Sequence, residues 1–205
     1  NDPFPFRLRN TDAPIGELVR SETAVLLRNA FIDTALGSGL AIPSELKSTG
    51  DPLTYVAQAR GPATAAFRRH IAASGGKIIS YIPNNAYLVR VDADGAARLA
   101  NWSGTQSVLP FEPYYKLEMK LLEMAVTGKP LPEGALLNVV LFPNSEPAAA
   151  KRLARLGVEV LSQDRTPFGA KLVARVPADK LAALARLTEV QGLERHRPRR
   201  LANDL

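Results

Sequence analysis

The stretch GGKIISYIPNNAYLVRV, residues 75–91, decides the fold class. It holds two short runs rich in β-branched and aromatic residues, 77–82 and 86–91, with the turn residues Pro-Asn-Asn between them. Two such runs around a turn are typical of a β-hairpin. Glycine adopts the left-handed conformation at the end of a helix at little cost, so Gly75-Gly76 indicates that a helix ends just before the hairpin.

The residues on both sides of the hairpin extend it to a β-α-β-β-α-β unit. A β-rich run precedes Gly61-Pro62, and proline suits the first turn of a helix. Asp92 is a suitable N-cap for a second helix that follows the hairpin. The predicted strands are 53–59, 77–82, 86–91 and 107–111, and the predicted helices are 63–74 and 92–102.

The same order of elements returns later in the chain. The predicted strands are 136–142, 158–162, 170–176 and 190–195, the helices are 146–156 and 177–187, and residues 163–169 form a turn. Gly76 aligns with Gly157, and the second copy has the longer hairpin turn, where insertions are tolerated. We therefore predict an α+β protein with two tandem ferredoxin-like subdomains, each with two helices on one face of a four-stranded antiparallel sheet.

Five regions follow from this pattern. Residues 1–50 form an N-terminal extension whose apolar runs are expected to pack against a core in short strands or a short helix. Residues 51–117 are the first subdomain. Residues 118–135 contain a linker and most of a helix predicted over 114–124. Residues 136–195 are the second subdomain, and 196–205 form an extended tail that holds three arginines.

The composition excludes several classes of protein. The chain has 205 residues, of which 46% are hydrophobic and 22% charged, as in globular proteins. No apolar run reaches the roughly 18 residues that a membrane span needs. There is no cysteine for a disulfide, a thiol nucleophile or a metal, and two histidines far apart argue against a histidine-rich metal site. We expect no cofactor. The net charge of +6 favours an acidic partner surface but falls short of a dedicated nucleic-acid binder.

The residues offer no catalytic group. Ser38 lies in LGSGL, which does not meet the pattern of a nucleophile elbow. His70 stands on the apolar side of a predicted helix, where a structural role is expected. Asp92 and Asp94 lie at a helix start, where carboxylates favour the helix dipole. We therefore predict that this chain has no enzymatic activity of its own.

Two other functions remain open. A stand-alone ligand-binding or regulatory module of the same fold is compatible with the sequence. An RNA-binding protein has less support, because RNA-recognition modules carry aromatic residues on their two central strands. Here Ala86, Leu88 and Val91 occupy those positions, and the strand 170–176 contains no aromatic residue.

The two copies, the glycine-ended first helix and the last strand with its tail resemble the propeptides of subtilisin-like serine proteases. Residues 55–62 and 75–91 are similar to the fervidolysin-like N-terminal prodomain, and residues 156–160 and 184–194 to the subtilisin propeptide. The resemblance implies a non-catalytic pro-region of a secreted or extracytoplasmic protease, acting as intramolecular chaperone and inhibitor. Its partner would be the catalytic domain that follows Leu205 in the same precursor, and it implies no partner among nucleic acids or membranes.

The resemblance also implies a set of protease-binding residues. In such propeptides the sheet packs on two helices of the enzyme, and acidic residues at the end of the last strand cap those helices. Glu194 matches the first acid, and His196 stands in place of the second, which implies weaker or pH-sensitive capping. The tail would lie in the substrate cleft like a product, with Leu205 next to the cut. The implied binding residues are Glu194, His196, Leu201, Ala202, Asn203, Asp204 and Leu205.

Overall fold

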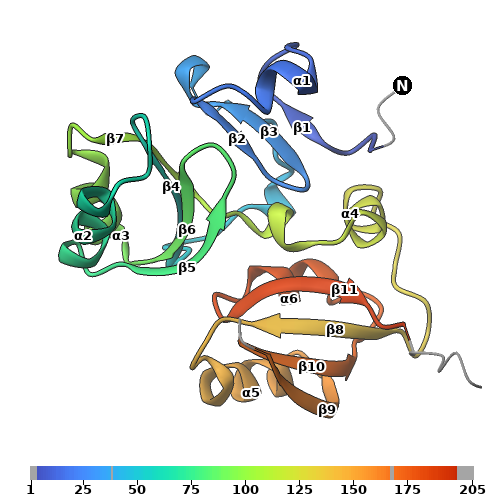
Figure 1. The fold of residues 1–205 in the computed structure, drawn as a ribbon. Helices are drawn as coiled ribbons and strands as arrows, with labels where there is room; N and C mark the ends of the chain where they lie inside the picture. The colour runs from blue at the N-terminus through green and yellow to red at the C-terminus, as the bar shows by residue number, and fades with distance from the viewer. Residues whose placement is uncertain (1–3, 38, 167–168, 198–205) are drawn as a thin grey trace, which may run out of the picture.

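Three β-sheets organise the structure, a computed structural model that describes residues 4–37, 39–166 and 169–197. Figure 1 shows an N-terminal sheet in blue at the top, a second sheet in green beside its two helices, and a third in orange and red at the bottom. The predicted α+β class is confirmed.

The first four-stranded sheet is entirely antiparallel and has the order β5-β6-β4-β7. Its helices pack on one face, where Phe67, Ile71 and Leu99 join a buried cluster with sheet residues. Asp92 accepts a hydrogen bond from the backbone N–H of Gly95, so the predicted N-cap is confirmed. This first unit consists of β4 Thr54–Ala59, α2 Ala65–Ala73, β5 Lys77–Ile82, β6 Ala86–Arg90, α3 Ala93–Ala100 and β7 Thr105–Pro110.

The second four-stranded sheet has the order β11-β8-β10-β9, which is the order of the first when strands are matched along the chain. Its helices also pack on one face, around Leu153 and Leu184. This second unit consists of β8 Leu136–Leu141, α5 Glu146–Arg155, β9 Glu159–Thr166, β10 Gly169–Arg175, α6 Leu181–Arg186 and β11 Val190–Arg195.

Three details of the repeat differ from the prediction. β9 continues to Thr166 through the predicted turn, because an edge strand exposed on both faces accommodates polar residues. α6 begins at Leu181, since residues 177–180 form a hydrogen-bonded turn. The left-handed residues that end α2 and α5 are Gly75 and Gly157, with φ of +83° and +72°, so aligning Gly76 with Gly157 was wrong by one residue.

Gly95 lies where α3 approaches the end of α2. A Cβ atom there would stand 2.3 Å from Val91 Cγ2 and 2.5 Å from the carbonyl oxygen of Ser74. We expect Gly95→Ala to lower the free energy of unfolding by about 1–2 kcal/mol, although alanine is the better helix former by about 1 kcal/mol.

Chemical denaturation measures this effect, and Gly16→Ala is the matched control. Nothing lies within 4 Å of a Cβ built on Gly16 in α1 (Ile15–Leu18). Equal or higher stability of the Gly95 variant would show that the two helices separate at no cost.

The N-terminal segment covers the other face of the first sheet. Val25, Ala30 and Ile32 form a buried cluster there with sheet residues. Gln58, fully buried in β4, donates to the carbonyl of Glu22 and accepts from Thr34 Oγ1 at 2.7 Å. The segment contains β1 Leu8–Arg9, α1, β2 Ala24–Leu26, β3 Ala30–Asp33 and short 3-10 helices at Thr34–Leu36 and Ser44–Leu46, and its sheet has the order β1-β3-β2.

The connection between the units is a 3-10 helix, Pro113–Lys116, and α4, Met119–Val126. The sequence predicted one helix over 114–124. The helix is interrupted because Leu117 is extended and forms a parallel bridge with Leu193 of β11, whose carbonyl accepts from the N–H of Glu118 at 2.9 Å. The connector is thus attached to the edge of the second sheet.

Candidate functional site

The second sheet has one face that its helices leave open. Leu137, Val139 and Leu141 of β8 point into the cluster that contains residues of α4, α5 and α6. Side chains alternate along a strand, so Asn138 and Val140 point to the opposite face. The strand register places Val140 beside Lys171 and Gly192, and Asn138 beside Val173 and Glu194. This open face combines two half-buried aliphatic side chains with charged groups and the amide of Asn138, which is itself only 8% exposed.

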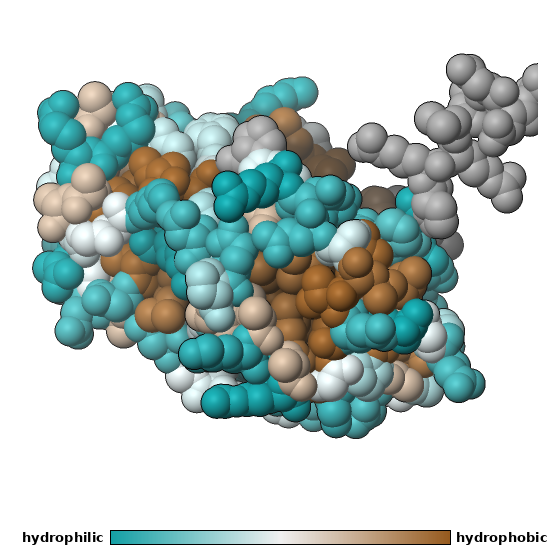
Figure 2. Space-filling view, turned by 90° about the horizontal axis from the view of Figure 1, so that it is seen from below, coloured by the Kyte–Doolittle hydropathy of each residue, from teal (hydrophilic) through white to brown (hydrophobic). Residues whose placement is uncertain are grey.

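The edge strand β9 adds exposed hydrophobic surface to the second unit. Val160 and Leu161 are each 44% exposed. β9 lies at the lower edge of the sheet in Figure 1, and the view from below in Figure 2 shows hydrophobic side chains at the surface on this side. Singly exposed aliphatic residues are common, so β9 alone identifies no site.

Two of the predicted site residues lie together on the open face. Glu194 and His196 alternate along β11 and its continuation, and both are half-buried. Glu194 Oε1 lies 3.7 Å from Arg28 Nη1 in the loop between β2 and β3, and His196 Nδ1 lies 3.0 Å from Asn138 Oδ1. Each already has a partner within the chain. The other predicted residues, Leu201, Ala202, Asn203, Asp204 and Leu205, lie outside the described residues.

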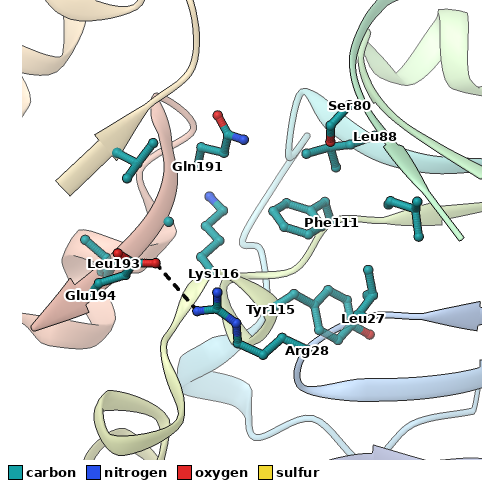
Figure 3. Close-up of a pocket in the computed structure, with 13 residues that line it drawn as sticks. Leu27, Arg28, Ser80, Leu88, Phe111, Tyr115, Lys116, Gln191, Leu193 and Glu194 are labelled. Carbon is teal, nitrogen blue, oxygen red and sulfur yellow. Dashed lines mark ion pairs between the residues drawn. The ribbon is translucent and has the colours of Figure 1, made fainter. Parts of the chain in front are cut away.

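An open cleft of about 330 Å³ lies between the two units, beside Glu194. Figure 3 shows Leu27, Phe111 and Tyr115 along one side and β11 with Leu193 and Glu194 along the other. Sequence reasoning missed this cleft because its lining comes from segments far apart in the chain.

Lys116 lies at the junction between the units and is only 7% exposed. Its ammonium donates to the carbonyl of Leu187 at 2.9 Å. Burial, together with repulsion from Arg90, lowers the pKa of Lys116 to about 7, and the charges of Glu189 and Glu112 partly oppose this shift. The buried surroundings of Lys116 therefore destabilise its protonated form near neutral pH.

Arg90 joins the two units at the same junction. Its Nη1 donates to the carbonyl of Thr188 at 2.8 Å, and its guanidinium lies 4.9 Å from the ring centre of Phe142. Burial lowers the pKa of Arg90. Because Arg90 is in β6 and its partners are in the second unit, this contact fixes how the units meet.

The surroundings of the other titratable groups near the cleft and in the first unit indicate structural roles. Burial raises the pKa of Tyr114 to about 12, and burial followed by the charge of Glu112 raises that of Tyr115. His70 stacks on Trp102 with ring centres 4.6 Å apart. Ser38 lies outside the described residues, which contain no cluster of three or more His, Asp or Glu side chains fit to hold a metal.

A comparison with known protein families finds a match for the first part of the chain. Residues 20–112 match the model of a family described as a domain of unknown function, DUF8729. The matched range runs from just before β2 to just after β7, so it joins β2 and β3 of the N-terminal segment to the first unit. No curated protein matches the chain. Among the helices of the described residues, none has the length and hydrophobicity that crossing a bilayer requires.

Proposed function

We propose that this chain is the pro-region of a secreted subtilisin-like serine protease, built from two ferredoxin-like subdomains. It acts as an intramolecular chaperone and inhibitor of the catalytic domain. The shared strand order of the two antiparallel sheets, with paired helices on one face of each, supports the assignment of both subdomains. The resemblance of the sequence to subtilisin propeptides supports the function.

One observation carries the choice of docking surface. The face of the first sheet opposite its helices is buried under β2 and β3, whereas Lys171 and Val173 on the same face of the second sheet are only half-buried. Val140 and Glu194 on that face line the cleft toward the first unit. Of the two described four-stranded sheets, the second therefore leaves more of its helix-free face accessible to a partner. β11 lies at the edge of that sheet and leads directly into the tail. A catalytic domain seated on this face would receive the tail in its substrate cleft.

The charges on this face fit such a partner. Glu194 is an anion at the end of the last strand, where it would face the N-terminus of an enzyme helix. Its ion pair with Arg28 is long and solvent-exposed, so exchanging it for a helix N-terminus costs little. His196 stands where the resemblance places a second acid, so its contribution would depend on pH.

Inhibition of subtilisin by the purified chain tests the proposal. We expect competitive inhibition of the hydrolysis of a chromogenic peptide, with an inhibition constant on the order of nanomolar. Deleting residues 198–205 should weaken inhibition at least about tenfold, because the product-like contacts are lost. Val173→Asp should weaken it similarly, because it places a charge in the centre of the open face.

Val19→Asp is the matched control, since Val19 is 55% exposed at the end of α1, away from the second sheet. It should inhibit like the original chain. Circular dichroism and thermal unfolding would establish that all variants are folded. No inhibition by the full chain at micromolar concentration, or equal inhibition after deletion of the tail, would overturn the proposal.

A further inference from the structure

A second cavity, of about 340 Å³, lies at the junction between the units. The loop 48–53 that precedes β4 forms one side, and side chains of the connector and the second unit form the other. Three of these side chains are cationic: Lys116, Arg152 and Arg186. They come from the 3-10 helix, α5 and α6, so three separate elements direct positive charge to one place.

The cavity is rich in uncommitted hydrogen-bond donors. The ammonium of Lys116 has one described acceptor, the carbonyl of Leu187, for its three N–H groups. Arg152 uses its Nε toward Glu189, and no described residue accepts from its terminal nitrogens. The backbone N–H groups of Thr49 and Gly50 also donate to no described acceptor.

The acidic groups around the cavity are already paired. Asp51, the acid in the lining, accepts from the N–H of Leu53, the hydroxyl of Tyr55 and the N–H of Ala93. Outside the lining, Glu112 accepts from the N–H of Ser48, and Glu189 pairs through Oε1 with Arg152 at 3.4 Å, while its Oε2 has no described hydrogen-bond partner. Arg90 adds a further positive charge near Lys116. The cavity itself therefore has an excess of positive charge.

We propose that this cavity binds a small tetrahedral oxyanion, sulfate or phosphate, between the loop 48–53 and the cations Lys116, Arg152 and Arg186. The four oxygens of such an anion accept several charge-assisted hydrogen bonds from different directions, as this arrangement of donors requires. Since the loop belongs to the first unit and Arg152 and Arg186 to the second, the bound anion holds the units together. This inference is independent of the proposed protease.

Burial of Lys116 gives the site a dependence on pH. An anion in the cavity stabilises the charged ammonium, and the ammonium in turn strengthens binding of the anion. Because the pKa of Lys116 lies at about 7 in the empty site, binding should weaken as pH rises above that value. Sulfate remains a dianion throughout this range. Any change in its affinity with pH therefore comes from titration of the protein and not of the anion.

Calorimetric titration of the full chain with sodium sulfate, at constant ionic strength, tests the site. At pH 6 we expect saturable binding with a dissociation constant below about 1 mM, and at least about fivefold weaker binding at pH 9. Arg186→Gln, at an exposed position, should weaken binding at least tenfold without affecting folding. Lys116→Met should weaken binding at pH 6 and abolish its pH dependence.

Arg69→Gln is the control, because Arg69 is an exposed arginine of α2 in the first unit. It removes the same charge and should leave binding unchanged. The control also separates site binding from the general stabilisation that sulfate gives to folded proteins. The absence of saturable binding, or an equal loss in the Arg69 and Arg186 variants, would overturn the proposal.

Discussion

Replacing Asn29 with alanine is expected to lower the free energy of unfolding by about 3 kcal/mol. Asn29 is fully buried in the loop between β2 and β3. Its Nδ2 donates to the carbonyls of Tyr114 and Leu117, at 2.9 and 2.7 Å. Alanine removes both bonds and leaves a void, and each buried carbonyl that loses its donor costs roughly 1–3 kcal/mol. Urea denaturation measures the change.

The adjacent residue gives the control for this prediction. Arg28→Ala removes the exposed ion pair with Glu194, and we expect it to change stability by less than about 1 kcal/mol. The comparison shows whether the buried amide of Asn29 or the surface ion pair of Arg28 with Glu194 holds the loop between β2 and β3 in place. If the two variants were equally stable, the amide would contribute nothing beyond the surface pair.

Much of the repeated fold could be predicted because its signals are local. The bounds of β5 and β11 agree with the predicted strands 77–82 and 190–195. Asp92 and Gly157 mark a helix start and a helix end through contacts within a few residues. These features follow from neighbouring residues, so the sequence contains enough information to locate them.

The features that the sequence did not reveal depend on distant contacts. β1 pairs in parallel with β3, so Leu8 lies beside Ala30, and the strands are too short to have a clear pattern. The interruption of the connector helix arises from the bridge between Leu117 and Leu193. In the sequence Lys116 cannot be distinguished from a surface lysine. Its burial results from packing two units and a loop around it.

That burial leads to the second large prediction, which concerns pH. Unfolded chain holds the proton of Lys116 up to its ordinary pKa of 10.5, whereas folded protein holds it only up to about 7. Between these values the unfolded state binds more protons, so the free energy of unfolding rises with pH, by at most about 1.4 kcal/mol per pH unit. This stability is lost as pH falls from 10.5 to 7, and below 7 the loss is constant.

Lys116→Met removes this dependence while filling a similar volume. The carbonyl of Leu187 keeps the N–H of Val190 as a donor, so the variant leaves no orphaned acceptor there. In buffers free of sulfate and phosphate, we expect the variant to be the more stable protein at pH 6. That advantage should shrink by about 2–3 kcal/mol between pH 6 and 9. Lys151→Met, at an exposed position of α5, should show no such trend in denaturation measured across the same range. If the difference in free energy of unfolding between the Lys116 variant and the original chain stayed constant across this pH range, the ammonium of Lys116 would be as well solvated as one at the surface.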